Sequence, residues 1–309
     1  MNRYIGLDIG GTKCAVVLGT EDGTILDRFV IPSGTCEETL AQLFDAIAAH
    51  HDYTAIGVSC GGPLNAVTGT ILSPPNLPGW DEVHITERLT ARFGVPAFLR
   101  NDADACAVAE WKYGAGRGTK NMIFLTFGTG MGAGLILNGK LYSGATGSAG
   151  EVGHMRLTEF GPVGYGKAGS FEGYCSGGGI AQLGEMMTRV CAQTGHPVAW
   201  ADNTITAKQL AEAALNGDTA ASKVWQQSAQ MLGRGISLLI DLLNPERIVI
   251  GSIFQRSESL LRSEMEKVIA EECLPHNAKA CQIVAAKLGD QIGDIAALSI
   301  AVSGMKGEI

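Results

Sequence analysis

An aspartate and a glycine–threonine turn join two apolar segments near the start of the chain. The stretch reads Tyr4-Ile-Gly-Leu-Asp8-Ile-Gly10-Gly11-Thr12-Lys13-Cys-Ala-Val-Val-Leu18. A tight glycine turn between two strands leaves backbone N–H groups facing one point, and such concavities bind anions, above all phosphate. The Asp8 carboxylate before the turn can hold a metal ion, usually through water. The stretch predicts a grip for nucleotide phosphates and Mg²⁺, although an ordinary β-hairpin has the same pattern.

The same plan recurs in the second half of the chain. An apolar segment at 121–127 leads into Gly128-Thr129-Gly130-Met-Gly132, and a second apolar segment follows. Repetition on this scale predicts two related domains, whose turns would hold one polyphosphate from two sides. The GxxxxGK[ST] loop is absent, and neither glycine cluster opens a helix as a dinucleotide-binding turn does.

Composition limits the classes of function. A chain of 309 residues, 46% hydrophobic and 17% charged, is typical of a globular protein of about two domains. The formal charge of −8 and the lack of a basic run argue against a nucleic-acid partner. We expect no signal peptide and no membrane span, because acidic residues interrupt the apolar runs. Eight cysteines without a CxxC pair predict reduced thiols and a cytoplasmic protein.

The order of predicted elements is typical of an α/β protein. Strands are expected over 4–8, 14–18 and about 25–31, and strands alternate with helices thereafter. We predict an N-terminal α/β domain over 1–117, joined by a C-terminal helix at about 292–309. A C-terminal α/β domain is predicted over 118–291, and the glycine-rich stretch 114–118 is a candidate hinge.

Seven segments, in one order along the whole chain, resemble those of the ROK sugar kinases. Besides the two glycine turns they are Ser59-Cys60-Gly61-Gly62-Pro63-Leu64, Pro75-Asn76-Leu77-Pro78-Gly79-Trp80, Asn101-Asp102, Ala149-Gly150-Glu151-Val-Gly153-His154 and Glu172-Gly-Tyr-Cys-Ser176-Gly177. The resemblance implies two actin-like (ribonuclease H-like) domains with a cleft between them. It also implies a glucokinase-like enzyme, a homodimer that transfers the γ-phosphoryl group of ATP, with Mg²⁺, to O6 of a hexose. Glucose is the leading candidate substrate, and fructose, mannose, allose, N-acetylhexosamines and β-glucosides are the alternatives.

The resemblance assigns roles to individual residues. Asp102 would be the catalytic base, since a sugar hydroxyl attacks poorly until a carboxylate accepts its proton. Asp102 lies between an expected strand over 97–100 and an expected helix over 102–113, and an Asp at this position is also an ordinary helix cap. The expected sugar ligands are Gly62, Asn76, Asn101, Asp102, Glu151, His154 and Glu172. The expected ATP and phosphate ligands are Asp8, Gly10, Gly11, Thr12, Lys13, Gly128, Thr129, Gly130, Gly132, Gly251 and Ser252. Asp8 would also hold Mg²⁺ through water. Lys13 could instead be an ordinary solvated lysine.

Four positions depart from the ROK pattern. Many ROK proteins carry three zinc-binding cysteines where this chain has Val163, Tyr165 and Ser170, so we expect no zinc and expect Val163, Tyr165 and Phe171 to hold the loop by core contacts. A second glycine usual after Gly251 is Ser252 here. Nucleotide preference could therefore differ, and inorganic polyphosphate stays open as a donor.

Two other functions share parts of this sequence pattern. ROK repressors place a DNA-binding domain ahead of the kinase-like part, and we expect none here because the first glycine turn begins near residue 8. A sugar-binding regulatory protein without kinase activity would have no use for Asp102 and two phosphate turns. Of the tryptophans, Trp80 is the candidate for stacking on sugar, and Trp111, Trp200 and Trp225 are expected in packing roles.

Overall fold

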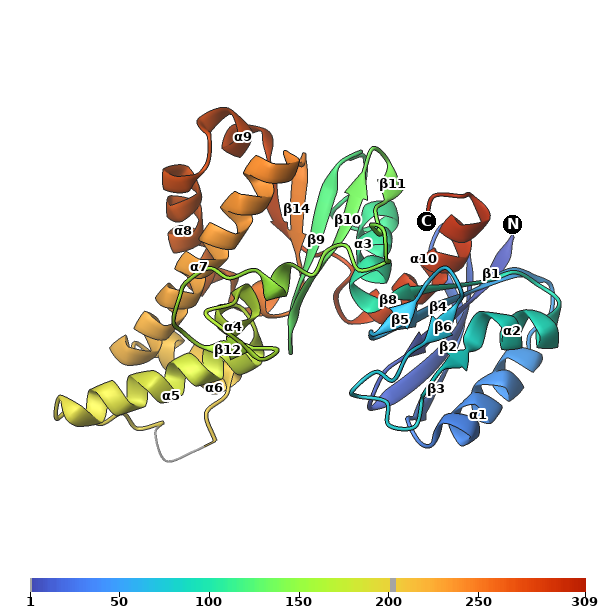
Figure 1. The fold of residues 1–309 in the computed structure, drawn as a ribbon, viewed down its shortest axis with the longest axis horizontal. Helices are drawn as coiled ribbons and strands as arrows, with labels where there is room; N and C mark the ends of the chain where they lie inside the picture. The colour runs from blue at the N-terminus through green and yellow to red at the C-terminus, as the bar shows by residue number, and fades with distance from the viewer. Residues whose placement is uncertain (1, 201–203) are drawn as a thin grey trace. The chain divides into compact units, whose positions relative to one another are not determined.

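Helices and strands alternate along the chain, which confirms the predicted α/β class (Figure 1). The computed structural model describes residues 2–200 and 204–309. The chain divides into unit 1, made of Met1–Phe124, Gly134–Ala149 and Lys287–Ile309, and unit 2, made of Leu125–Ala133 and Gly150–Ala286. The predicted domain boundaries at 117 and 291 stay a prediction.

The sheet of unit 1 has the strand order β3-β2-β1-β4-β8. β1 (Arg3–Ile9), β2 (Lys13–Thr20) and β3 (Ile25–Pro32) form the antiparallel meander predicted from the sequence. β4 (Tyr53–Cys60) and β8 (Ala97–Asn101) run parallel to β1. β1 and β2 are buried on both faces, which accounts for their continuous apolar sequences.

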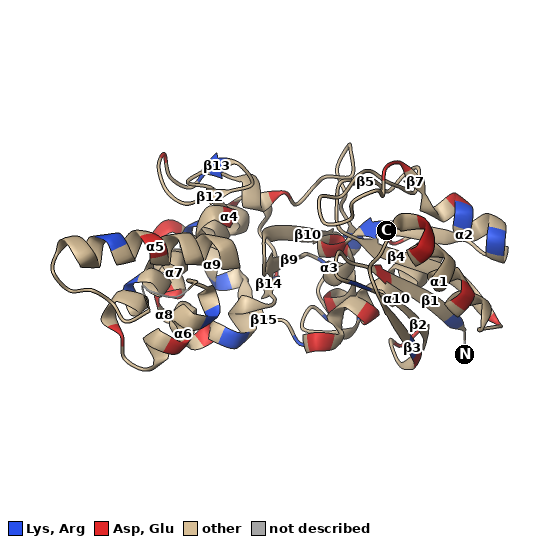
Figure 2. Cartoon of the chain, turned by 90° about the horizontal axis from the view of Figure 1, so that it is seen from below, with Lys and Arg blue, Asp and Glu red and all other residues tan. Residues whose placement is uncertain are grey.

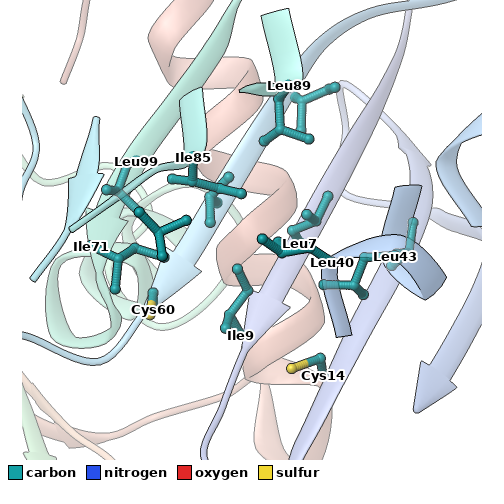
Figure 3. Close-up of a cluster of buried hydrophobic side chains, with 14 of the residues drawn as sticks. Leu7, Ile9, Cys14, Leu40, Leu43, Cys60, Ile71, Ile85, Leu89 and Leu99 are labelled. Carbon is teal, nitrogen blue, oxygen red and sulfur yellow. The ribbon is translucent and has the colours of Figure 1, made fainter. Parts of the chain in front are cut away.

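Helices cover both faces of this sheet. α1 (Cys36–Ala48) and α2 (Ile85–Phe93) pack on one face, where Leu40, Leu43, Ile85 and Leu89 meet Leu7 and Ile9 of β1 (Figure 3). α10 (Ile292–Met305) packs on the other face, against Tyr4, Val17 and Ala55, and also contacts α3 (Asp102–Tyr113). Full burial of each large aliphatic side chain contributes about 1.5–3 kcal/mol. The core of unit 1 therefore fixes the ends of its strands, where the predicted site residues lie.

A small sheet and a short helix complete unit 1. The strand order is β5-β6-β7, with β5 at Leu64–Asn65, β6 at Thr70–Ile71 and β7 at Val83–His84. A 3₁₀ helix, η2, spans Gly289–Gln291 immediately before α10.

The second large sheet contains the second predicted hairpin. Its order is β11-β10-β9-β14-β15, with β9 at Met122–Phe127, β10 at Met131–Leu137, β11 at Lys140–Leu141, β14 at Arg247–Ile250 and β15 at Gln282–Ala285. β14 and β15 are parallel. The glycine–threonine turn of residues 128–130 therefore joins two strands, as predicted, and opens no helix.

Unit 2 is mainly helical outside the part of this sheet that it contains. The helices are η1 (Val152–His154), α4 (Phe171–Tyr174), α5 (Gly177–Gln193), α6 (Ala207–Leu215), α7 (Thr219–Leu243), α8 (Ile253–Glu272) and α9 (Pro275–Ala280). A short hairpin pairs β12 (Val163–Gly164) with β13 (Lys167–Ala168). Basic and acidic residues are interspersed along the chain in both units (Figure 2). Within the described residues, no helix has both the length and the apolar character needed to cross a bilayer.

Candidate functional site

The ends of three neighbouring strands bring the predicted residues of unit 1 to one edge of its sheet. Ile9 at the end of β1 pairs with Cys60 at the end of β4, and Cys60 pairs with Asn101 at the end of β8. The first glycine turn, the Gly61–Gly62 loop and Asp102 come directly after these three ends. Because the carboxyl ends of parallel strands lie at the same edge, the segments that follow them lie side by side.

The first glycine turn is held by backbone hydrogen bonds and by close packing. Gly10 N–H donates to the Lys13 carbonyl at 3.2 Å, and Ser33 N–H donates to the Thr12 carbonyl at 3.0 Å. A β-carbon added at Gly11 would lie 2.5 Å from the carbonyl oxygen of Asn76, so the loop that carries Asn76 touches the turn. Thr12 is exposed and, within the described residues, its hydroxyl has no hydrogen-bond partner. The hydroxyl is therefore available to a ligand.

The Asp8 carboxylate lies in a strongly acidic environment. Its pKa is raised from the usual 3.8 to about 6, mainly by desolvation and then by the charges of Asp294 and Asp102. Lys13 and Arg28 oppose the shift. In the described part of the chain no hydrogen bond reaches this carboxylate, and no group of three or more His, Cys, Asp or Glu is placed to hold a metal. One partnerless carboxylate beside other acids fits a hydrated Mg²⁺, which needs few protein ligands.

Asn101 and Asp102 stand where the sequence predicts them, at the junction of β8 and α3. The helix cap is Asn101, whose Oδ1 accepts from Asp104 N–H at 2.7 Å, which leaves the Asn101 amide group as a donor. Asp102 keeps an exposed surface, and its Oδ1 accepts from Ala103 N–H at 2.9 Å. Desolvation outweighs that hydrogen bond and raises the pKa of Asp102. The backbone N–H at the start of α3 therefore lowers the pKa of Asp102 less than desolvation by the surrounding protein raises it.

The second glycine turn is built from its own backbone and from the start of α5. Gly128 N–H donates to the Gly130 carbonyl at 3.1 Å, and Gly177 N–H donates to the Gly128 carbonyl at 2.8 Å. Gly132 N–H donates to the Thr126 hydroxyl at 2.9 Å. Thr129 is exposed at the tip of this turn. The N-terminus of α5 therefore lies beside the predicted phosphate ligands, where a helix favours anions.

The three predicted sugar ligands of unit 2 surround the start of β10. Glu172 Oε2 accepts from Met131 N–H at 3.0 Å. Ala133 N–H donates to the Gly150 carbonyl at 2.8 Å, which places the segment with Glu151 and His154 along the same strand. His154 is exposed, and its ring meets that of Tyr165 edge-on at 6.4 Å. The sugar roles of these residues stay predictions.

A cavity of about 830 Å³ opens on the second glycine turn within unit 2. Gly128, Thr129 and Ser252 line it, whereas Gly130, Gly132 and Gly251 do not. The remaining walls come from the first residues of α5 and α8, from α6 and the two residues before it, and from Trp225 of α7. Its volume is in the range of sites for nucleotides and drug-sized ligands.

The sequence and the fold are both similar to those of known proteins. The sequence profile of the ROK family matches residues 4–303. The chain belongs to the ROK family. A glucokinase of Streptomyces coelicolor (strain ATCC BAA-471 / A3(2) / M145) is 31% identical over an alignment of 311 positions, which covers 97% of this chain and 98% of that protein.

Solved structures agree with this assignment. A ROK family glucokinase from Streptomyces griseus, crystallised with glucose and AMPPNP, is 30% identical with a TM-score of 0.74, over 97% of this chain and 99% of that one. A ROK family transcriptional regulator is 27% identical with a TM-score of 0.84, over 97% of this chain and 78% of the regulator. The actin-like fold is therefore confirmed, and the family includes both sugar kinases and regulators.

The serine that replaces a usual ROK glycine keeps the backbone of a glycine. Ser252 has φ 54° and ψ −108°, a combination that is strained for a residue with a β-carbon. Its hydroxyl accepts from Arg256 at 3.2 Å, and its N–H donates to Gln255 at 3.0 Å. The serine at this position therefore adds a side chain to the cavity wall and keeps the glycine-like backbone conformation of the turn.

Ser252→Gly is expected to stabilise the protein by about 1 kcal/mol, because glycine adopts this conformation without strain. The free energy of unfolding in urea measures the change. Ser252→Ala is the matched control, since it keeps the strain and loses only the hydroxyl. Equal stability of the glycine and alanine variants would contradict the account.

The loop that carries zinc cysteines in many ROK proteins is held here mainly by hydrogen bonds. Of the three residues expected in the core, only Phe171 is buried, whereas Val163 is 46% exposed and Tyr165 is 83% exposed. The expectation for Val163 and Tyr165 is therefore wrong. Ser170, at the third cysteine position, is fully buried and its hydroxyl accepts from Gly173 N–H at 3.1 Å. Long polar side chains form the other hydrogen bonds that hold the loop. They can reach its backbone groups even though the loop has no apolar core of its own.

Those contacts attach the loop to its neighbours at several points. Arg156 donates to the Ala168 carbonyl at 2.7 Å, and Lys167 donates to the His154 carbonyl at 2.7 Å. Gln182 of α5 accepts from Val163 N–H at 2.9 Å and donates to the Val163 carbonyl at 2.8 Å. The loop next to His154 is thereby fixed from both α5 and the segment before it.

Gln182→Ala is expected to destabilise the protein by about 1 kcal/mol, because two hydrogen bonds to one residue are lost. Gln193→Ala, at the exposed end of the same helix, is the control and should have little effect. Urea unfolding of both variants measures the difference. If Gln182→Ala matches its control, the loop is held by other contacts.

The structure brings further residues to the two glycine turns and also corrects the expectation for Trp80. Arg256 and Lys208 bring positive charge to the cavity, and Gly293 and Asp294 of α10 lie beside Asp8. Trp80 is fully buried in the apolar cluster of unit 1, so a stacking role on sugar is wrong for it.

Proposed function

We propose that this protein is an ATP- and Mg²⁺-dependent hexose kinase that phosphorylates O6, with glucose as the leading substrate. The observation that carries the proposal is the placement of Asp102, which is solvent-accessible at the strand edge that also holds the first glycine turn. Glucokinases that match this chain over almost its whole length support the same function. We also propose a cytoplasmic homodimer, as the resemblance to the family implies.

The chain's own residues would do little covalent chemistry and much positioning. Asp102 would accept the proton of the attacking hydroxyl, and its raised pKa makes the ionised carboxylate a better acceptor. Asn101 would donate to a neighbouring hydroxyl of the sugar. Thr12, Thr129 and the N–H groups of the two glycine turns would bind phosphate oxygens. Magnesium held near Asp8 through water would neutralise charge on the transferred phosphoryl group.

Coupled release of ADP against a panel of hexoses tests the proposal and names the substrate. Glucose should give the highest kcat/KM, and fructose, mannose, allose, N-acetylhexosamines and a β-glucoside complete the panel. A parallel series with inorganic polyphosphate tests the donor. A protein that binds sugar and turns over none of them would instead be a regulatory member of the family.

A further inference from the structure

The carboxylate of Asp8 lies directly against a glycine of the C-terminal helix. A β-carbon added at Gly293 would lie 2.5 Å from Asp8 Oδ2. Real β-carbons do not approach an oxygen so closely, so an alanine at this position must displace the carboxylate. The backbone of Gly293 is not in the left-handed region, so this close contact, and not backbone conformation, requires glycine.

The side-chain alternation of β1 directs Asp8 toward α10. Tyr4 packs with α10, so Gly6 and Asp8, which lie on the same face of the strand, also point toward that helix. A β-carbon at Gly6 would lie 2.6 Å from Leu298 N. The same β-carbon would lie 3.0 Å from Ala297 C. Ala297 and Gly293 are four residues apart, so they lie on one face of α10 and are separated by about 6 Å, and two residues of strand span about 6.8 Å. The contact of Gly6 at Ala297 therefore predicts a contact of Asp8 at Gly293, as observed.

Close packing and an ion pair prevent α10 from sliding along the sheet. Gly57 pairs with Gly6, and a β-carbon at Gly57 would lie 2.3 Å from Ala297 O and from Ala301 N. Arg28 Nε of β3 donates to Asp294 Oδ2 at 2.6 Å, and the Asp294 side chain is only 10% exposed. The backbone of α10 is therefore fixed at Ala297 and Ala301, and its first turn is held by the Asp294 side chain.

We propose that Gly293 is a positioning residue for Mg²⁺-nucleotide binding, because its lack of a β-carbon leaves the space that the Asp8 carboxylate occupies. The inference rests on the proposed function, in which Asp8 accepts from metal-bound water. Within residues 2–200 and 204–309 no hydrogen bond holds this carboxylate, so packing against Gly293 decides its direction. The rigid first turn of α10 thereby becomes part of the phosphate end of the site.

Gly293→Ala tests the proposal against Gly304→Ala, a matched change in the same helix. A β-carbon at Gly304 would lie 2.5 Å from the ring of Phe98, so the control strains packing without touching a carboxylate. Calorimetric titration with ADP at increasing Mg²⁺ is the readout, beside kcat and thermal unfolding. We expect the Mg²⁺ concentration for half-maximal ADP binding to rise about tenfold or more in Gly293→Ala and to stay unchanged in Gly304→Ala. Sugar binding should be unaffected in both.

A second variant keeps the test decisive if Gly293→Ala does not fold. Asp8→Ala/Gly293→Ala removes the group that the new methyl meets, so it should fold as well as Asp8→Ala alone. Failure of this double variant to fold, or an unchanged Mg²⁺ requirement in folded Gly293→Ala, overturns the proposal. So does wild-type protein whose ADP binding ignores Mg²⁺. Wild-type protein that binds Mg²⁺-ADP but phosphorylates no sugar would reject the proposed function alone.

Discussion

Asp102→Asn is expected to lower kcat by at least about 10²-fold while hexose affinity stays near that of the wild type. Asparagine has the same shape and can still accept from Ala103 N–H, which holds Asp102 Oδ1 at 2.9 Å. It cannot take the proton of the attacking hydroxyl. Coupled ADP release gives kcat, and calorimetry gives the dissociation constant of the sugar.

Asp45→Asn is the control for this prediction, since Asp45 is an exposed aspartate on α1. It should leave both quantities unchanged. A kcat near normal in Asp102→Asn would remove Asp102 from the role of base. Loss of sugar binding in step with kcat would make it a sugar ligand only.

Asp8→Asn is expected to weaken Mg²⁺-nucleotide binding by about 10- to 100-fold and yet to stabilise the folded protein. The folded protein raises the pKa of Asp8 from 3.8 to about 6, which means that it disfavours the ionised carboxylate. The shift corresponds to a cost of order 1–3 kcal/mol at neutral pH, which the neutral amide avoids. Urea unfolding and Mg²⁺-dependent ADP binding measure the two effects.

The stabilisation by Asp8→Asn should depend on pH in a defined direction. Below 3.8 the carboxyl is protonated in both the folded and the unfolded protein, so the substitution removes no penalty. As the pH rises through about 6, the folded protein must carry a desolvated charge, and the advantage of asparagine reaches its full size. An advantage that is equal at pH 4 and pH 8, or absent at both, would contradict this electrostatic account.

Local patterns were sufficient to predict the elements that carry the site. The apolar runs around Gly10–Gly11 and around residues 128–130 predicted two hairpins, and both are present. Asp102 was predicted at a strand-to-helix junction, and β8 ends at Asn101 where α3 begins. These features depend on neighbours in the sequence, such as a glycine turn between apolar segments, so they can be read without the fold.

Contacts between distant segments could not be predicted in this way. Trp80 belongs to a segment with a sugar-loop pattern, yet the apolar cluster of unit 1 buries it completely. Val163 and Tyr165 are apolar or aromatic, yet they are exposed because hydrogen bonds from Gln182 and neighbouring residues hold their loop. An apolar side chain tends to be buried, but the space that other elements leave decides which apolar side chains are actually buried.

The sequence by itself determined the family, the two glycine turns and the identity of the candidate base, because each is written in consecutive residues. Only the tertiary structure decided what surrounds them. Arg28 and Asp294 are 266 positions apart, and their ion pair helps to place Gly293 against Asp8. The pKa of Asp8 and the cavity beside Thr129 likewise arise from side chains that meet only when the sheets are covered by their helices. Desolvation and close packing depend on all the atoms around a group, and no stretch of the chain contains that information alone.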